Sequence, residues 1–373
     1  MSTLKVNAIR GTGASSDAIS VNSTDGTCTA KITNNLSNRN LIINGAMNFN
    51  QRGGTTTGQG YLLDRWHIYS APTGKHTVSQ DTEAPVGFKY SMKWTSASAY
   101  TPTTGNYFYT GQRIEGHNWD QMEYGTANAK TCTVSFWARS SITGTWSGIL
   151  KNNAQDRTYP WEYTISSANT WEKKTVTIPG CTDGTWLSGN NAGAWLYFCI
   201  GSTTSGTTYL GSANSWQNSN LIGTTGSNSL VNTNGATLYI TGVQLEVSDH
   251  ATEFEMSSYG DELARCRRYF QRDGGGQYSG YGLGLCASST HAIMTHLLVP
   301  AMRAAPSVTS EGNIRGYDGS ANENIATWET NRSTPTQLWI EPTKSGAGWT
   351  GGRPLLVGNN NDTSGYFNLS AEL

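Results

Sequence analysis

Hydrophobic and polar residues alternate over much of this chain, and the clearest alternation lies between residues 236 and 247. Its apolar positions recur every second residue apart from one slip at Gly242, and they are Leu238, Ile240, Val243, Leu245 and Val247. A period of two predicts a β-strand with one buried face, and the slip predicts a bulge or bend in that strand. We therefore expect one face of this stretch to pack against a hydrophobic core.

The apolar spacing becomes helical from Asp261. Leu263, Cys266 and Phe270 lie three or four residues apart, after two acidic residues and among four arginines. Acidic residues near the start of a helix and basic residues near its end suit the helix dipole. The pattern predicts a helix over 261–271, which the following glycine triplet stops. Because no other stretch has a convincing helical pattern, we interpret this helix as the connector between a larger β-domain before it and a smaller one after it.

Stretches with β-like alternation, separated by turn residues, fill the chain on both sides of this helix. Before the helix they number about eight to ten over roughly 215 residues, which is the count expected of a two-sheet jelly roll with antiparallel sheets packed face to face. The sequence therefore predicts an all-β fold. Residues 40–259 are expected to form the jelly-roll β-sandwich, residues 260–273 the short connector helix, and residues 274–373 a smaller C-terminal β-sandwich.

Residues 1–39 carry only short β-like fragments between polar turns. Fragments of this length cannot bury a core by themselves. Such a segment is either disordered or ordered by pairing with identical chains or with a docking partner. We favour the second alternative and interpret residues 1–39 as an extended N-terminal attachment and oligomerisation segment.

The composition supports the all-β interpretation and narrows the classes of function. Among 373 residues there are 43 glycines but only 14% charged residues, which is typical of many short strands joined by turns. The net charge of −1 provides no electrostatic footprint for nucleic acid. The N-terminus lacks the apolar core of a signal peptide, and no run reaches the roughly 18 apolar residues of a membrane helix. We therefore expect no nucleic-acid partner, no membrane insertion, and folding in a cytoplasm.

Candidate catalytic and metal-binding groups are few. The densest acidic stretch holds Glu115, Asp120 and Glu123. It can be a solvated loop, which we favour, a calcium site, since carboxylates and loop carbonyls suit that ion, or a glycosidase acid pair. The six cysteines are scattered without a CxxC pair, and the histidines lie outside any recognisable nucleophile motif. We expect buried free thiols, no enzymatic activity and no cofactor, and the sequence leaves a structural calcium open.

Aromatic residues are the stronger functional signal, with 13 tryptophans and 18 tyrosines. Sugars stack their apolar faces on exposed rings while their hydroxyls bond to nearby polar side chains. Several rings lie beside turn residues or near glycine-rich loops, which favours exposure, although packing roles are the alternative. The candidate glycan- or receptor-binding residues are Trp119, Trp161, Tyr281, Tyr317 and Trp349. Strand-like surroundings predict core positions for Trp66, Trp94, Trp137 and Trp195. Arg65 is expected to form a structural ion pair rather than clamp a ligand.

Several motifs recur in a series that spans roughly residues 40–272. They are NLIINGAMNFNQRG, GYLLDRWHIYS, TVSFWARSS, TWEKKTVTIPG and ITGVQLEVSDHATEFEMSSYGDELARCRRYFQR. The series resembles the carbohydrate-binding-module-like jelly roll of tail fibres and related structural proteins of phages, many of them marine. The opening MSTLKVNAIRGTGASSDAISV resembles the start of marine phage virion proteins, and HLLVPAMRAAPSVT with the terminal SAEL resembles the small β-sandwich that follows the helix in these fibres. The resemblance implies a trimeric virion appendage.

Our hypothesis from the sequence is a non-enzymatic structural protein of a phage virion, assembled in the host cytoplasm. It would be a homotrimeric tail fibre whose residues 1–39 dock on other tail or neck proteins and whose β-domains bind host surface polysaccharide or another receptor. Because the N-terminus would lie on the particle, we expect residues 274–373 to form the distal tip.

Two alternatives stay open. The first is a head or neck fibre or decoration protein of the virion. The second is a glycan depolymerase or a free lectin, although a depolymerase would more usually carry a long β-helix, and no repeat of that kind is visible in the sequence.

Overall fold

The structure is a computed structural model that describes residues 6–10, 12–13, 17–30, 38–202 and 209–373. It is nearly all β, with 42% strand and 5% helix, which confirms the predicted fold class. The chain divides into two compact units, residues 1–39 and residues 40–373. In the parts of the chain that the structure describes, no helix is long and apolar enough to cross a membrane.

The first unit contains a three-stranded antiparallel sheet of very short strands. They are β1 (Ala8–Ile9), β2 (Ile19–Val21) and β3 (Cys28–Ala30). Every side chain that the structure describes in this unit is exposed or half-buried. A sheet this small without a buried face has little to stabilise it except its backbone hydrogen bonds.

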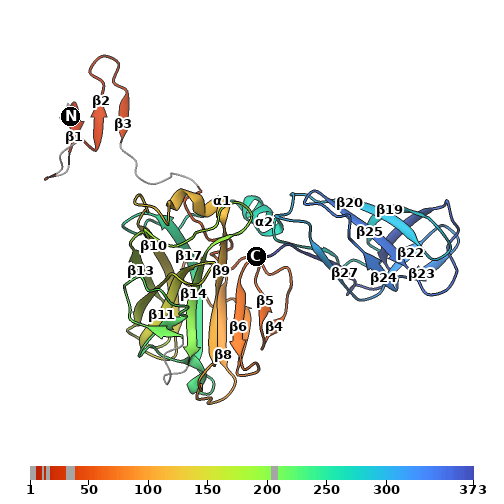
Figure 1. Cartoon of the computed structure of the whole chain (residues 1–373), viewed down its shortest axis with the longest axis horizontal. Helices are drawn as coiled ribbons and strands as arrows, with labels where there is room; N and C mark the ends of the chain where they lie inside the picture. The colour runs from red at the N-terminus through yellow and green to blue at the C-terminus, as the bar shows by residue number, and fades with distance from the viewer. Residues whose placement is uncertain (1–5, 11, 14–16, 31–37, 203–208) are drawn as a thin grey trace. The chain divides into compact units, whose positions relative to one another are not determined.

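The second unit begins with a sandwich of two six-stranded antiparallel sheets (Figure 1). The first sheet has the order β13 (Glu172–Ile178), β10 (Cys132–Ser140), β17 (Thr237–Val247), β8 (Ser91–Ser96), β7 (His76–Asp81) and β4 (Thr55–Thr56). The second sheet has the order β12 (Thr158–Ile165), β11 (Gly144–Asn152), β14 (Ala192–Ser202), β9 (Tyr107–Glu115), β6 (His67–Ala71) and β5 (Gly60–Tyr61). Sequence neighbours thus often lie in different sheets, as expected for a jelly roll.

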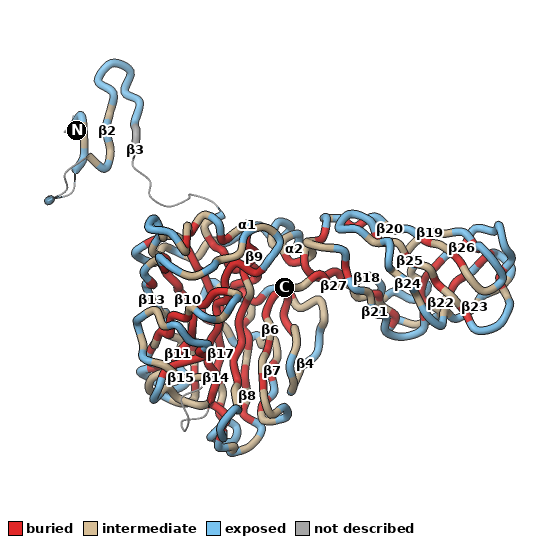
Figure 2. Tube along the Cα trace, in the orientation of Figure 1, coloured by how far each residue is buried: buried red, intermediate tan, exposed pale blue. Residues whose placement is uncertain are grey.

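The core of this sandwich is formed by the inward residues of both sheets. Phe136 on β10 contacts Phe198 on β14 and Trp161 on β12, with ring centroids 4.9 and 5.8 Å apart. The buried stretches in Figure 2 follow the strands of both sheets. In β17 the pairing with β10 slips next to Gly242, whose φ of 62° suits glycine, so the predicted bulge is confirmed.

Short elements join these strands. They are α1 (Gly116–Trp119), η1 (Asp120–Met122), η2 (Leu230–Asn232) and the parallel pair β15 (Leu210–Gly211) and β16 (Gly223–Thr224). The core tryptophans Trp66 and Trp94 are buried as predicted, whereas Trp137 is only half-buried. Trp195 is buried too, but on the outer face of the second sheet rather than in the core between the sheets. Five cysteines are buried free thiols as predicted, and Cys28 is exposed.

The helix after the sandwich is shorter than the sequence predicts. Helix α2 (Tyr259–Arg267) begins at Ser258, whose side chain accepts a hydrogen bond from the Asp261 backbone N–H (3.2 Å). Instead of continuing to residue 271, the chain enters strand β18 (Phe270–Gly274), which pairs with β27 (Tyr366–Ser370). The helical spacing of Phe270 was misleading because the strand partner lies about a hundred residues away in the sequence.

The remaining strands form two further antiparallel sheets. One has the order β18, β27 and β21 (Ser307–Glu311). The other has the order β23 (Asn322–Asn324), β22 (Ile314–Tyr317), β26 (Pro354–Asn359), β19 (Gly280–Cys286), β20 (Ala292–Leu297), β25 (Gln337–Thr343) and β24 (Thr327–Glu329). Their shared core includes Met294, Ile340 and Phe367, which confirms the smaller C-terminal sandwich.

The last residues of the chain contact the jelly roll again. The Glu372 carboxylate forms ion pairs with the side chains of Arg52 (3.1 Å) and Arg65, and the Tyr61 hydroxyl donates to the Leu373 carbonyl oxygen (2.9 Å). Arg65 is therefore in a structural ion pair as predicted, although its partner is remote in the sequence. Its neighbour Asp64 accepts hydrogen bonds from Gln51 instead, and burial raises the pKa of Asp64 to about 6.

Candidate functional site

The structure places four of the five predicted binding residues inside the protein. Trp119, Trp161, Tyr281 and Trp349 are at most 7% exposed, so their rings do not offer a face to a ligand and their selection is corrected. Turn residues near a tryptophan do not show which way its side chain points. Trp161, for example, belongs to β12, and its position in that strand directs the ring into the core. Only Tyr317, which is 40% exposed, keeps a surface position among these five.

The three carboxylates of the acidic stretch bind different partners. Glu115 is buried and accepts hydrogen bonds from Arg268 (2.6 Å) and Tyr269 (2.6 Å), which tie the jelly roll to the end of α2. Burial favours the neutral acid, but these two donors outweigh it and hold the pKa of Glu115 below its usual value. Asp120 accepts from the Ser188 hydroxyl (2.7 Å), and Glu123 pairs with Lys130 (2.5 Å). Each carboxylate thus has a separate structural partner.

No metal site is evident in the residues that the structure describes. They contain no group of three or more histidine, cysteine, aspartate or glutamate side chains that could hold an ion.

A concentration of rings and cations lies on the outer face of the second sheet. We call it the aromatic face, and it consists of His67, Tyr69, Tyr107, Tyr109, Arg113, Lys151, Trp195 and Tyr197. Strand β9 shows how the sequence builds it, because Phe108 and Ile114 point into the core while Tyr107, Tyr109 and Arg113 alternate with them and point outward. None of these residues was among the predicted binding residues, which were sought beside turns and loops, although the alternating tyrosines of β9 were a signal for this face.

The pairing of the strands brings these residues into rows. Arg113 on β9, Trp195 on β14 and Lys151 on β11 are direct cross-strand neighbours. One row further, Gly111 on β9 lies between His67 and Tyr197. Gly111 is required there, because a β-carbon would lie 2.3 Å from the Tyr197 ring and 2.0 Å from a backbone oxygen of β14.

The tyrosines of the aromatic face hold one another in place. Tyr69 stacks on Tyr109, with ring centroids 4.6 Å apart and an interplanar angle of 14°. Tyr197 lies edge-on to both rings and donates a hydrogen bond from its hydroxyl to that of Tyr69 (3.1 Å). The Tyr69 hydroxyl also accepts from the Arg113 side chain (3.0 Å). Such mutual support pre-organises the face, and Tyr69 remains partly accessible at its surface.

Two cations flank the ring of Trp195. The Arg113 guanidinium carbon lies 4.3 Å and the Lys151 ammonium nitrogen 4.8 Å from the ring centroid. Lys151 is buried, and its ammonium donates to the side-chain oxygens of Gln155 (3.0 Å) and Asn220 (2.9 Å). Burial, and to a lesser extent the charge of Arg113, lower the pKa of Lys151 to about 7.

Three buried nitrogen atoms of the aromatic face have no hydrogen-bond partner in the residues that the structure describes. They are Nδ1 of His67, Nε of Arg113 and Nε1 of Trp195. Leaving a buried polar group unpaired costs about 1–3 kcal/mol, and most such groups in proteins are paired. Trp195 is only 6% exposed, so a polar ligand would reach these atoms past the half-buried side chains of His67, Tyr69 and Arg113, which are among the accessible members of the aromatic face.

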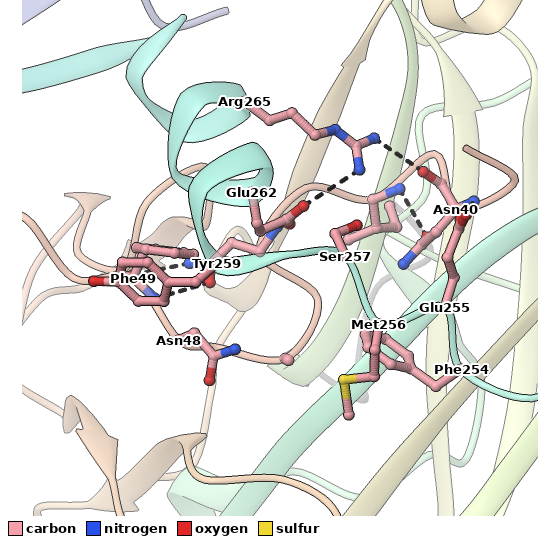
Figure 3. Close-up of a pocket in the computed structure, with 13 residues that line it drawn as sticks. Asn40, Asn48, Phe49, Phe254, Glu255, Met256, Ser257, Tyr259, Glu262 and Arg265 are labelled. Carbon is pink, nitrogen blue, oxygen red and sulfur yellow. Dashed lines mark hydrogen bonds and ion pairs between the residues drawn. The ribbon is translucent and has the colours of Figure 1, made fainter. Parts of the chain in front are cut away.

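A pocket of about 120 Å³ lies beside α2 and is the main alternative site (Figure 3). Its rim includes Tyr259, which is 71% exposed and packs on Phe49 with ring centroids 4.8 Å apart. Its charged groups are already paired, because Arg265 bonds to Glu262 (3.3 Å) and to the carbonyl oxygen of Asn40 (3.1 Å). These contacts fasten α2 to the sandwich, so the aromatic face is the better candidate for a polar ligand.

Comparisons with known proteins give structural neighbours only. No family model matches this sequence, and no curated protein matches it. A similar structure is the enzymatically active domain of tailspike protein 4 from bacteriophage CBA120, with 17% identity and a TM-score of 0.32 over 56% of this chain and 22% of that chain. Another is a carbohydrate-binding module in complex with β-1,4-galactotriose, with 10% identity and a TM-score of 0.30 over 56% of this chain and 99% of the module.

A third neighbour is the family 11 carbohydrate-binding module from Clostridium thermocellum in complex with a β-1,3-1,4-mixed-linked tetrasaccharide. It has 13% identity and a TM-score of 0.27 over 52% of this chain and 99% of the module. Neighbours with TM-scores this low assign no function to this chain.

Proposed function

We propose that this chain is a non-enzymatic glycan-binding protein and that its ligand lies on the aromatic face. The observation that carries the proposal is a set of unpaired buried nitrogen atoms, the N–H donors of Arg113 and Trp195 and Nδ1 of His67, beside the partly accessible ring of Tyr69. A sugar combines an apolar ring face, which stacks on aromatic side chains, with hydroxyl oxygens, which accept hydrogen bonds. One sugar residue would therefore satisfy both features of this surface.

We expect Tyr69→Ala to weaken glycan binding about two- to tenfold, because one aromatic stacking contact contributes about 0.5–1.5 kcal/mol. Binding should be measured by isothermal titration calorimetry with an oligosaccharide chosen from a glycan array that carries neutral and acidic sugars. The matched control is Tyr259→Ala, which removes an exposed ring beside the pocket of Figure 3. Loss of affinity in the Tyr259 variant alone would move the site to that pocket and contradict the proposal.

We further propose, from the sequence resemblance, that the protein is a homotrimeric tail fibre of a phage virion, attached through residues 1–39 and directed at host surface polysaccharide. A head or neck fibre is the alternative within the same class. Self-association has structural support of its own in the seven-stranded C-terminal sheet.

One face of that sheet is unusually apolar. All four leucines that are exposed in the described residues lie on it, at positions 283, 285, 297 and 356. Leu356 pairs with both Leu283 and Tyr317 in neighbouring strands, and Leu285 lies two residues from Leu283 on the same strand, so these side chains are neighbours on one face. Contiguous apolar patches of this kind mark interaction surfaces. We name the patch the leucine face and propose that it packs against the same face of other copies of this chain, since identical apolar surfaces match in size and chemistry.

Leu283→Glu is expected to convert a trimer into single chains, because a buried carboxylate at the centre of the leucine face would have no partner. Native mass spectrometry at micromolar concentration should report three chains for the unchanged protein and one for the variant. Val86→Glu, a substitution at a fully exposed apolar residue outside this face, is the control and should leave the mass unchanged. A single-chain mass for the unchanged protein would contradict the proposal.

A further inference from the structure

We infer that the glycan bound by the aromatic face is anionic, and that its carboxylate or sulfate group lies against Arg113 and the indole N–H of Trp195. The inference rests on the proposed function and adds the chemical class of the ligand.

The charges of the aromatic face are all positive in the residues that the structure describes. No ion pair joins Arg113 or Lys151 to a carboxylate there, although most of the other arginines have such a partner. Glu372, at the edge of the face, is already bound by Arg52 and Arg65. Glu115, two residues beyond Arg113 on β9, is bound by Arg268 and Tyr269. An acidic ligand would therefore meet cations whose charge is not neutralised by the chain.

The donor geometry suits an oxyanion. Arg113 and Trp195 are cross-strand neighbours, and each has one buried N–H without a partner. The guanidinium is held over the indole ring at 4.3 Å and by its bond to the Tyr69 hydroxyl, so little side-chain freedom is lost on binding. Hydrogen bonds from a charged donor to an anion are about twice as strong as neutral ones. Two fixed donors beside each other thus favour an oxygen pair that carries charge over a neutral hydroxyl.

Lys151 contributes charge rather than contact, because its ammonium is buried behind Gln155 and Asn220. The charged or titratable groups that face it are Arg113 from β9 and Tyr197 from β14; the other groups, Gln155, Asn220 and Trp195, do not titrate. A ligand carboxylate or sulfate bound at Arg113 and Trp195 would stabilise the protonated ammonium and raise the pKa of Lys151 above 7. Affinity for the anion should consequently be highest below pH 7 and fall as the pH rises above it.

The test compares matched charged and neutral glycans on the full chain: polygalacturonate against its methyl ester for carboxylates, and dextran sulfate against dextran for sulfates. We expect the charged member of at least one pair to bind at least tenfold more tightly, with an affinity that falls at higher salt. Arg113→Gln should weaken the charged member far more than the neutral member and so remove most of this difference, because the charge of Arg113 acts only on the charged glycan. The control is Arg332→Gln, because Arg332 is also held near a tryptophan ring, 5.5 Å from the centroid of Trp339, but lies elsewhere on the surface.

Lys151→Met should retain binding but lose the decline of affinity above pH 7. If neutral glycans bind as tightly as charged ones, and Tyr69→Ala weakens both equally, the inference is wrong and the proposed function stands. If charged glycans bind but Arg113→Gln and Arg332→Gln weaken them alike, the attraction is general and the inference is also wrong. If no glycan of either kind binds on the array or in these pairs, both the inference and the proposed function fail.

Discussion

Replacing Glu372 by alanine is expected to destabilise residues 40–373 by about 3–5 kcal/mol, because it leaves the guanidinium of Arg65 buried without its counter-ion. Arg65 is 1% exposed, stacks on the ring of Tyr269 at 3.6 Å, and donates its other hydrogen bond to a backbone oxygen of β9. These contacts stabilise the guanidinium only in part, because neither partner carries a negative charge. Unfolding in guanidinium chloride, followed by tryptophan fluorescence, would measure the loss.

The control for this prediction is Glu329→Ala, which removes an exposed carboxylate from β24 and should change the free energy of unfolding by less than about 0.5 kcal/mol. Adding Arg65→Met to Glu372→Ala should restore part of the stability, because it removes the charge that lost its partner. A loss below about 1 kcal/mol for Glu372→Ala would show that water reaches Arg65 and that the ion pair is not structural.

The second large effect is a loss of stability in acid that originates at His76. This side chain is completely buried between the rings of Trp94 and Phe108, and neither of its ring nitrogens has a partner in the described residues. Burial lowers the pKa of His76 from 6.5 to about 4. Between pH 4 and pH 6.5 the unfolded chain therefore binds a proton at His76 that the folded chain does not bind. Stability is complete above pH 6.5 and falls by up to about 3 kcal/mol as the pH drops toward 4.

His76→Leu should remove this contribution, so the difference in unfolding free energy between the variant and the unchanged protein should shift in favour of the variant as the pH falls from 7 to 4. The comparison must be made between variants because two other groups titrate in the same range. Burial also lowers the pKa of His67 to about 4, which adds a loss of the same sign, and the pKa of Asp64 is raised to about 6, which adds a change of opposite sign. His117→Gln, at an exposed position on α1, is the control. Parallel pH profiles for His76→Leu and the unchanged protein would contradict the assignment.

The Glu372 contact also changes how the proposed tip should be tested. Removing residues 274–373 would delete the partner of β18 and the counter-ion of Arg65 together. A truncated chain could then fail to bind host cells because it is unfolded, not because it lacks a receptor site. Point substitutions on the surface, such as Tyr317→Ala, test the tip without this ambiguity, and the location of the tip stays a prediction.

Local patterns in the sequence predicted the elements that depend on neighbouring residues. The alternation of β17 predicted a strand, and the slip at Gly242 predicted its bulge, because both follow from the period of two and from the freedom of glycine. Strand-like surroundings predicted core positions for the rings of Trp66 and Trp94. The direction of a ring in a less regular stretch was not predictable in this way, and Trp161 was therefore placed wrongly.

The sequence by itself thus determined an all-β sandwich, its strand-forming stretches and the presence of a helix before the last hundred residues. Only the tertiary structure decided where that helix ends, because β18 depends on its pairing with β27. It also decided the partner of Arg65, which lies 307 residues away, and the row formed by Arg113, Trp195 and Lys151, which come from three separate strands. The physical reason is the same in each case: a side-chain period reports which residues share a face, whereas long-range hydrogen bonds between strands decide which faces meet.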